Sequence, residues 1–75
     1  MQAIIKSVKL EQRQLEWVAE VVYLRSDEGG EHRVSVPTGT YYFSTALIGL
    51  PRLIEEAIKG QGVDVVLIAA TTKLN

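Results

Sequence analysis

The residues that could carry chemistry in this sequence are few, and they form no known catalytic set. The chain has no cysteine and one histidine, which excludes a thiol nucleophile and a thiolate or imidazole metal cluster. His32 is the only imidazole base for a serine, and it follows a Gly29-Gly30 turn where an exposed ring is expected. We therefore expect no catalytic residue, no metal and no other cofactor.

The acidic residues also lack the spacing of a site. Glu55 and Glu56 are adjacent in a predicted helix, so their side chains project about 100° apart and cannot form an acid–base pair. Arg52 and Lys59 lie three or four residues away, which predicts ion pairs on a solvent-exposed helix face. Asp64 has no acidic neighbour with the spacing of a calcium loop.

One loop could bind a small ligand or an anion. Thr38, Gly39, Thr40 and Ser44 lead into a predicted helix start, where free backbone N–H groups and the helix dipole favour negative charge. The loop lacks the glycine spacing and the lysine of a phosphate-binding loop. A turn followed by a helix cap at Ser44 explains the same residues and is the preferred interpretation.

Length and charge narrow the class of protein. The chain has 75 residues, of which 47% are hydrophobic and 23% charged, so residues 1–75 are expected to form one folded domain. The formal net charge is −1 and neither sign is concentrated, which argues against nucleic acid and membrane partners. The N-terminus lacks a secretory signal, and the longest apolar run, 65–70, is too short to span a bilayer. A cytoplasmic location is expected.

The β-branched and aromatic runs predict four strands. These runs are residues 2–10, 16–25, 32–36 and 63–70. A helix remains an alternative for 16–25, because its apolar pairs also recur every four residues. The segment Asp27 to Gly30 favours a hairpin turn before the third strand.

A helix is predicted over residues 43–59. Its apolar positions recur at three and four residues and are Phe43, Ala46, Leu47, Leu50, Leu53, Ile54, Ala57 and Ile58. Ser44 is the expected N-cap, and Gly60 is expected to end the helix in a left-handed conformation. Pro51 predicts either a kinked helix or, preferably, a short turn followed by a helix that starts at Pro51. Residues 71–75 are expected to be a frayed polar tail.

The order β-β-β-α-β predicts an α+β fold with a mixed, mostly antiparallel sheet and one helix packed on one face. The helix lets the last strand run parallel to the first and third. A helix about 10 Å wide covers roughly two strands, so part of the sheet should need other cover.

The uncovered sheet face predicts a partner. Both faces of the second and last strands are rich in apolar residues, and the expected contact residues are Trp17, Val21, Tyr23, Val65 and Leu67. We expect a non-enzymatic protein–protein interaction module, with a homodimer favoured over a different protein partner. In the alternative, the sheet curls and the segment 41–43 folds over the open face, which would give a monomer.

Overall fold

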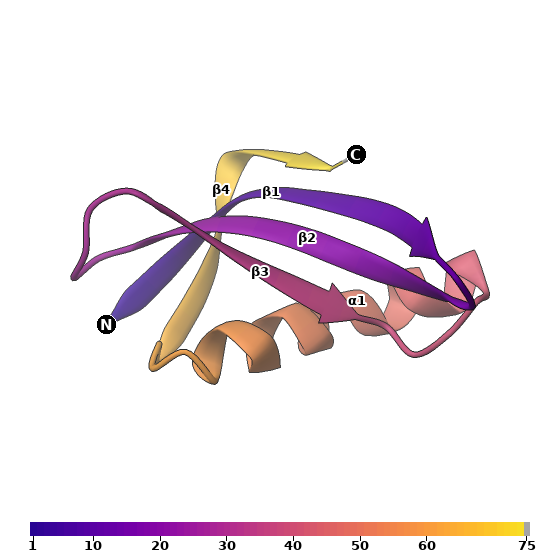
Figure 1. Cartoon of the computed structure of the whole chain (residues 1–75). Helices are drawn as coiled ribbons and strands as arrows, with labels where there is room; N and C mark the ends of the chain where they lie inside the picture. Colours follow the sequence, from indigo (N-terminus) through magenta and orange to yellow (C-terminus); the bar gives the residue numbers. More distant parts are fainter. Residues whose placement is uncertain (75) are drawn as a thin grey trace.

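The structure is a computed structural model that describes the backbone of residues 1–74 and the side chains of residues 1–68. Over this range the chain forms the strands β1 (Gln2–Arg13), β2 (Glu16–Arg25), β3 (Glu31–Pro37) and β4 (Val65–Leu74), and the helix α1 (Phe43–Lys59). The strands form one sheet in the order β3-β2-β1-β4, with α1 against one face (Figure 1). The predicted α+β class and element order are confirmed.

The strand pairings follow from the turns between them. β1 and β2 are antiparallel, as are β2 and β3, whereas β4 runs parallel to β1. Gly30, with a φ of 87°, lies in the predicted turn before β3. β1 continues three residues beyond the predicted end at Leu10, because residues 11–13 pair with residues 16–18 of β2. Gln14, with a φ of 52°, then makes the turn.

β4 forms one edge of the sheet. Its register against β1 shifts after the pair Ile5–Ile68, so that Ser7 pairs with Lys73, and the strand bends at this point (Figure 1). The prediction of a frayed tail is wrong for residues 71–74, which belong to the strand because Lys73 and Leu74 pair with Ser7 and Val8 of β1. Residue 75 lies outside the described residues.

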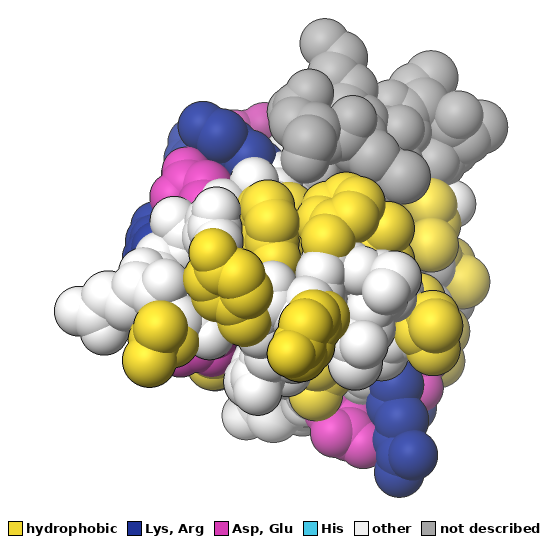
Figure 2. Space-filling view, turned by 90° about the vertical axis from the view of Figure 1, so that its right-hand side faces the viewer, with side chains coloured by type: hydrophobic (Ala, Val, Ile, Leu, Met, Phe, Trp, Pro, Cys, Tyr) yellow, Lys and Arg dark blue, Asp and Glu magenta, His cyan; other side chains and the backbone are white. Residues whose placement is uncertain are grey.

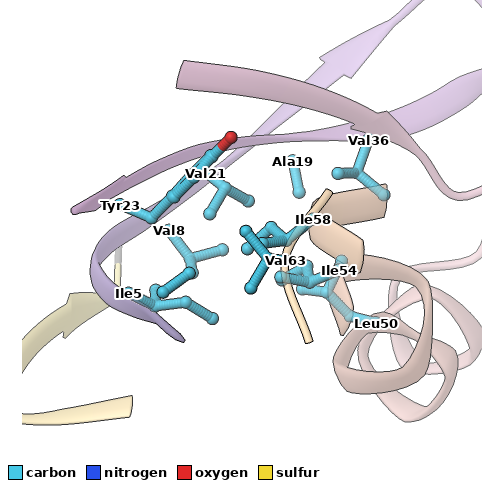
Figure 3. Packing of buried hydrophobic residues seen from close by; sticks show 11 residues of the cluster. Ile5, Val8, Ala19, Val21, Tyr23, Val36, Leu50, Ile54, Ile58 and Val63 are labelled. Atoms are coloured by element: carbon cyan, nitrogen blue, oxygen red, sulfur yellow. The ribbon is translucent and has the colours of Figure 1, made fainter. Parts of the chain in front are cut away.

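The core fills the space between the sheet and α1 (Figure 3). The strands bury small and β-branched side chains toward the helix, and α1 and the following loop supply large aliphatic ones. The cluster consists of Ala3, Ile5, Val8, Ala19, Val21, Tyr23, Val36, Leu50, Ile54, Ile58 and Val63. Each fully buried side chain of the size of valine or isoleucine contributes about 1.5–3 kcal/mol. This core holds α1 at a fixed position across the sheet.

The helix spans the predicted residues 43–59, but the preferred interpretation of its first half is wrong. It is one helix that contains Pro51, rather than a turn followed by a helix from Pro51. The buried positions Ala46, Leu50, Ile54 and Ile58 recur every four residues on both sides of this proline. Pro51 itself is exposed, so its ring lies outside the core. Continuous burial of this stripe outweighs the one backbone hydrogen bond that proline removes.

The predicted caps are also corrected. Tyr42 is the N-cap, without a side-chain capping bond, and Ser44 lies inside the first turn. Gly60 is right-handed, with a φ of −62°, and the left-handed residue is Gly62, with a φ of 91°. The chain turns two residues later than predicted because the N–H groups of Gln61 and Gly62 bond back to carbonyls of Ile58 and Lys59, which extends the helix end.

The sheet face away from α1 carries charged residues at its centre. Arg13 contacts Glu11 and Glu20 at 2.9 Å, and the Ser35 hydroxyl donates to Glu20 at 2.8 Å. Hydrogen bonds from Arg13, and then from Lys9, hold the pKa of Glu11 below its ordinary value. The open face is therefore polar around Glu20, whereas Val22 and Leu24 of the same face of β2 are half-buried apolar residues.

Candidate interaction surface

The loop between β3 and α1 is anchored on the start of β2. The backbone N–H and the hydroxyl of Thr38 both donate to the carbonyl oxygen of Trp17, at 2.9 and 2.7 Å. The N–H of Trp17 donates in return to the carbonyl of Thr40 at 3.0 Å. Gly39, with a φ of 72°, has the left-handed conformation that this turn requires. Thr38 therefore acts as a structural tie between the loop and the sheet.

The four residues predicted to bind an anion do not converge. The N–H of Gly39 donates to the Glu16 carboxylate at 3.2 Å, and the Thr40 hydroxyl accepts from the N–H of Tyr42 at 3.2 Å. Ser44 lies separately, exposed on the first turn of α1. A carboxylate beside Gly39 repels an incoming anion, so this arrangement favours the structural interpretation of the loop.

Trp17 supports the aromatic end of the same loop. Its indole N–H donates to the carbonyl of Tyr41 at 2.8 Å, and its ring meets Phe43 edge-on, with centroids 5.1 Å apart. Trp17 is half-buried in this position. By bonding the backbone, it fixes the loop while the side chains of Tyr41 and Tyr42 remain exposed.

Six large apolar side chains are exposed at this end of the molecule. We call them the helix-start patch, and its members are Leu15, Tyr41, Tyr42, Phe43, Leu47 and Ile48. Leu15 in the β1–β2 turn and Ile48 on α1 are more than 80% exposed, and Tyr42 is 73% exposed. The β1–β2 turn, the loop before α1 and the start of α1 all lie at one end of the fold (Figure 1). Figure 2 shows hydrophobic side chains gathered across this end, with charged ones near its borders.

The predicted contact residues occupy two different environments. Val21 and Tyr23 face α1 and are fully buried in the core of the single chain, so a second copy cannot reach them. The reason is that α1 covers this face of β2. The sequence alone did not show which face the helix would cover. Val65 and Leu67 lie on the opposite face, each 44% exposed.

Ile4 pairs with Leu67 across β1 and β4 and shares its exposure, so we call Ile4, Val65 and Leu67 the sheet patch.

The two patches differ in area. At about 200 Å² for a large apolar residue, the helix-start patch presents about 750 Å² and the sheet patch about 250 Å². The largest apolar patch on a typical monomer measures roughly 300–600 Å². Among the described residues, the summed exposed area of the helix-start patch therefore lies above this range, whereas the sum for the three residues of the sheet patch lies below it.

Among the polar residues considered for catalysis, the carboxylates on α1 have structural partners, whereas Nε2 of His32 is buried without a hydrogen-bond partner in the described part of the chain. His32 is half-buried rather than fully exposed, stacks on Tyr23 at 5.6 Å, and has Nε2 3.5 Å from the Glu28 carboxylate. Glu55 and Glu56 bond Lys59 and Arg52 across single turns of α1, as the sequence predicts. Residues 1–68 contain no cluster of three side chains suited to a metal ion.

In the described part of the chain, no helix has the length and apolar character needed to cross a membrane.

The sequence prediction did not identify Leu15, Leu47 and Ile48 as members of an exposed apolar surface. A usable signal was present in Ile48, which lies off the buried stripe of the helix and yet is aliphatic. A second signal was the absence of any charged residue from Thr40 to Pro51. Leu15 had no comparable signal, because its exposure depends on the β1–β2 turn.

Comparison with models of protein families, with curated proteins and with solved structures found no match for this chain. Function is therefore inferred from the chemistry of its own surface.

Proposed function

We propose that the chain is a non-enzymatic interaction module that forms a homodimer. The observation that carries the proposal is the helix-start patch, in which Leu15, Tyr42 and Ile48 project into solvent at one end of the fold. Apolar surface of this size is unfavourable in water at about 25 cal/mol for each Å² left uncovered. Association that covers it is the simplest function that explains why these residue types stand there.

The state of the polar side chains supports the same class of function. His32 is stacked against Tyr23, and the carboxylates on α1 are held in ion pairs with neighbouring cations. The hydroxyl of Thr38 is committed to a backbone carbonyl. The carboxylates of α1 and the Thr38 hydroxyl are therefore used to hold the fold, which supports a binding role over a catalytic one.

Subunit number is the decisive measurement. We expect sedimentation velocity and native mass spectrometry, over about 1–100 µM protein, to show a dimer that dissociates on dilution. The midpoint of urea unfolding should rise with protein concentration, because association stabilises only the folded chain. A single-chain mass at the highest concentration, together with a constant midpoint, would reject the proposal.

A further inference from the structure

The geometry points to the helix-start patch, and not the open sheet face, as the surface on which a second copy of this chain docks. This inference rests on the proposed homodimer and specifies its contact surface. In a two-fold symmetric contact the same surface is used on both chains, so each patch would cover the other. The residues that project furthest, Leu15, Tyr42 and Ile48, would then lie in the contact.

The area of the patch matches what such a contact needs. A stable interface buries roughly 800 Å² on each partner, and the helix-start patch alone presents about 750 Å². The sheet patch would supply about 250 Å², less than a third of that requirement. Among the side chains that the structure describes, only the helix-start patch reaches this size by itself.

The charge pattern is compatible with a second copy and argues against nucleic acid and anionic lipid. No charged residue occurs from Thr40 to Pro51, which is the whole loop and the first half of α1 that carry the patch. An uncharged surface can face its own copy without repulsion between like charges. Nucleic acid and anionic lipid select basic surfaces, and the patch offers them none.

The charges nearest the patch are already paired within the chain. Arg52, one turn beyond Ile48, bonds Glu56 at 3.1 Å. Glu16, beside the loop, accepts the N–H of Gly39 at 3.2 Å. These charged groups can stay at the solvated border of a contact while the apolar side chains meet, as is typical of protein interfaces.

The residue composition fits a contact as well. Tyr41, Tyr42 and Phe43 are aromatic, and aromatic residues are enriched in the buried centres of interfaces. Trp17 holds their backbone in place before any association, through its bond to the carbonyl of Tyr41. A surface that is ordered in advance loses less entropy when a partner binds.

The test compares two aspartate substitutions in the full chain, each at an exposed aliphatic residue. Ile48→Asp alters the helix-start patch and Leu67→Asp alters the sheet patch, while Ile48→Leu is a conservative control. Circular dichroism and urea unfolding establish that each variant folds. Tyr42→Ser serves as an independent second patch variant, since its side chain is 73% exposed. Sedimentation equilibrium gives the dimer dissociation constant of each protein.

We expect Ile48→Asp and Tyr42→Ser to raise the dissociation constant at least about 30-fold, the effect of removing a central contact residue. Leu67→Asp and Ile48→Leu should leave it within about three-fold. A dimer that survives both patch substitutions but is lost in Leu67→Asp would overturn this inference and leave the homodimer intact. A monomeric wild-type chain would instead reject the proposed function itself.

One further arm tests a lipid surface as the occupant. The wild-type chain is mixed with vesicles of phosphatidylcholine containing phosphatidylserine and sedimented. We expect it to stay in the supernatant, because the patch carries no basic residue. Binding to vesicles that Ile48→Asp abolishes, by a chain that is monomeric in solution, would overturn the inference in favour of a membrane.

Discussion

The two halves of α1 share one buried stripe but have opposite outer surfaces. Toward the core, Ala46 and Leu50 of the first half continue into Ile54 and Ile58 of the second without a break. Toward solvent, the second half carries only charged side chains in ion pairs, namely Arg52, Glu55, Glu56 and Lys59. The outer surface of the first half carries no charged side chain and exposes Leu47 and Ile48 beside Ser44 and Thr45.

This difference distinguishes the side chains of α1 that stabilise the folded monomer from those that do not. A helix on the surface of a monomer is expected to show the polar outer face that the second half has. The fold is already satisfied by the shared stripe, so the exposed Ile48 contributes little to the folded monomer. The apolar outer face of the first half therefore requires another explanation, and association supplies one.

The largest expected effect contrasts two isoleucines of the same helix. Ile58 is fully buried and Ile48 is 83% exposed. Replacing Ile58 by Ala should lower the free energy of unfolding by about 2–5 kcal/mol, through lost burial and a cavity. Ile48→Ala should change it by less than about 0.5 kcal/mol at a concentration low enough for monomers. Urea unfolding of both variants provides the measurement, and equal losses would break the comparison.

Pro51 marks the boundary between the two halves, and its removal should have the next largest effect. Pro51→Ala restores a backbone donor to the carbonyl of Leu47, at a position where the side chain is exposed. We expect thermal and urea unfolding to show a gain of about 1–2 kcal/mol, after allowing for the greater freedom of the unfolded chain. A loss of stability would mean that the proline ring makes a packing contact of larger value.

A third substitution places a charged residue on the outer surface of the first half of α1, as in the second half. Ile48→Glu places a carboxylate four residues before Arg52, the favourable order for a helical ion pair. The monomer should keep its free energy of unfolding within about 0.5 kcal/mol, while dimer formation is lost. Analytical ultracentrifugation and urea unfolding of the same sample test both parts. A destabilised monomer would show that Ile48 serves the core after all.

The smallest effect concerns the ion pairs of the second half. Glu56→Gln removes the partner of Arg52, whose side chain is 87% exposed, and should cost no more than about 0.5 kcal/mol. In about 1 M salt the difference from wild type should vanish, because exposed charges are screened. A loss of more than about 1 kcal/mol in the free energy of unfolding, unaffected by salt, would show that these ion pairs stabilise the fold rather than only making its surface polar.

The sequence predicted the strands and the fold class because local signals agreed with the tertiary structure. The same arrangement, a sheet with one helix packed on it, is indicated by the β-branched runs, the Gly29-Gly30 turn and the helical stripe. The preferred helix start at Pro51 was wrong because proline is a strong local signal, whereas the burial of Ala46 and Leu50 becomes visible only with the sheet in place. The left-handed conformation predicted for Gly60 was wrong for a similar reason, since Gly62 adopts that conformation instead.

The contact surface was less predictable than the fold. The sequence indicated apolar residues on both faces of β2, but not that α1 would cover the face of Val21 and Tyr23. Strand order and helix placement decide that question, and they depend on long-range packing. The charged cover of the opposite face arises from residues such as Arg13 and Glu20, which are seven positions apart in sequence and adjacent only across the β1–β2 pair.

Trp17 gives the chain a built-in optical reporter for the surface discussed above. It is the only tryptophan, its ring lies edge-on to Phe43, and its N–H bonds the loop beside the helix-start patch. Indole emission depends on the polarity of its surroundings. Any molecule that covers the patch should therefore shift the fluorescence of the unmodified protein to shorter wavelength, and dilution should reverse the shift. Association could be followed in this way without a label.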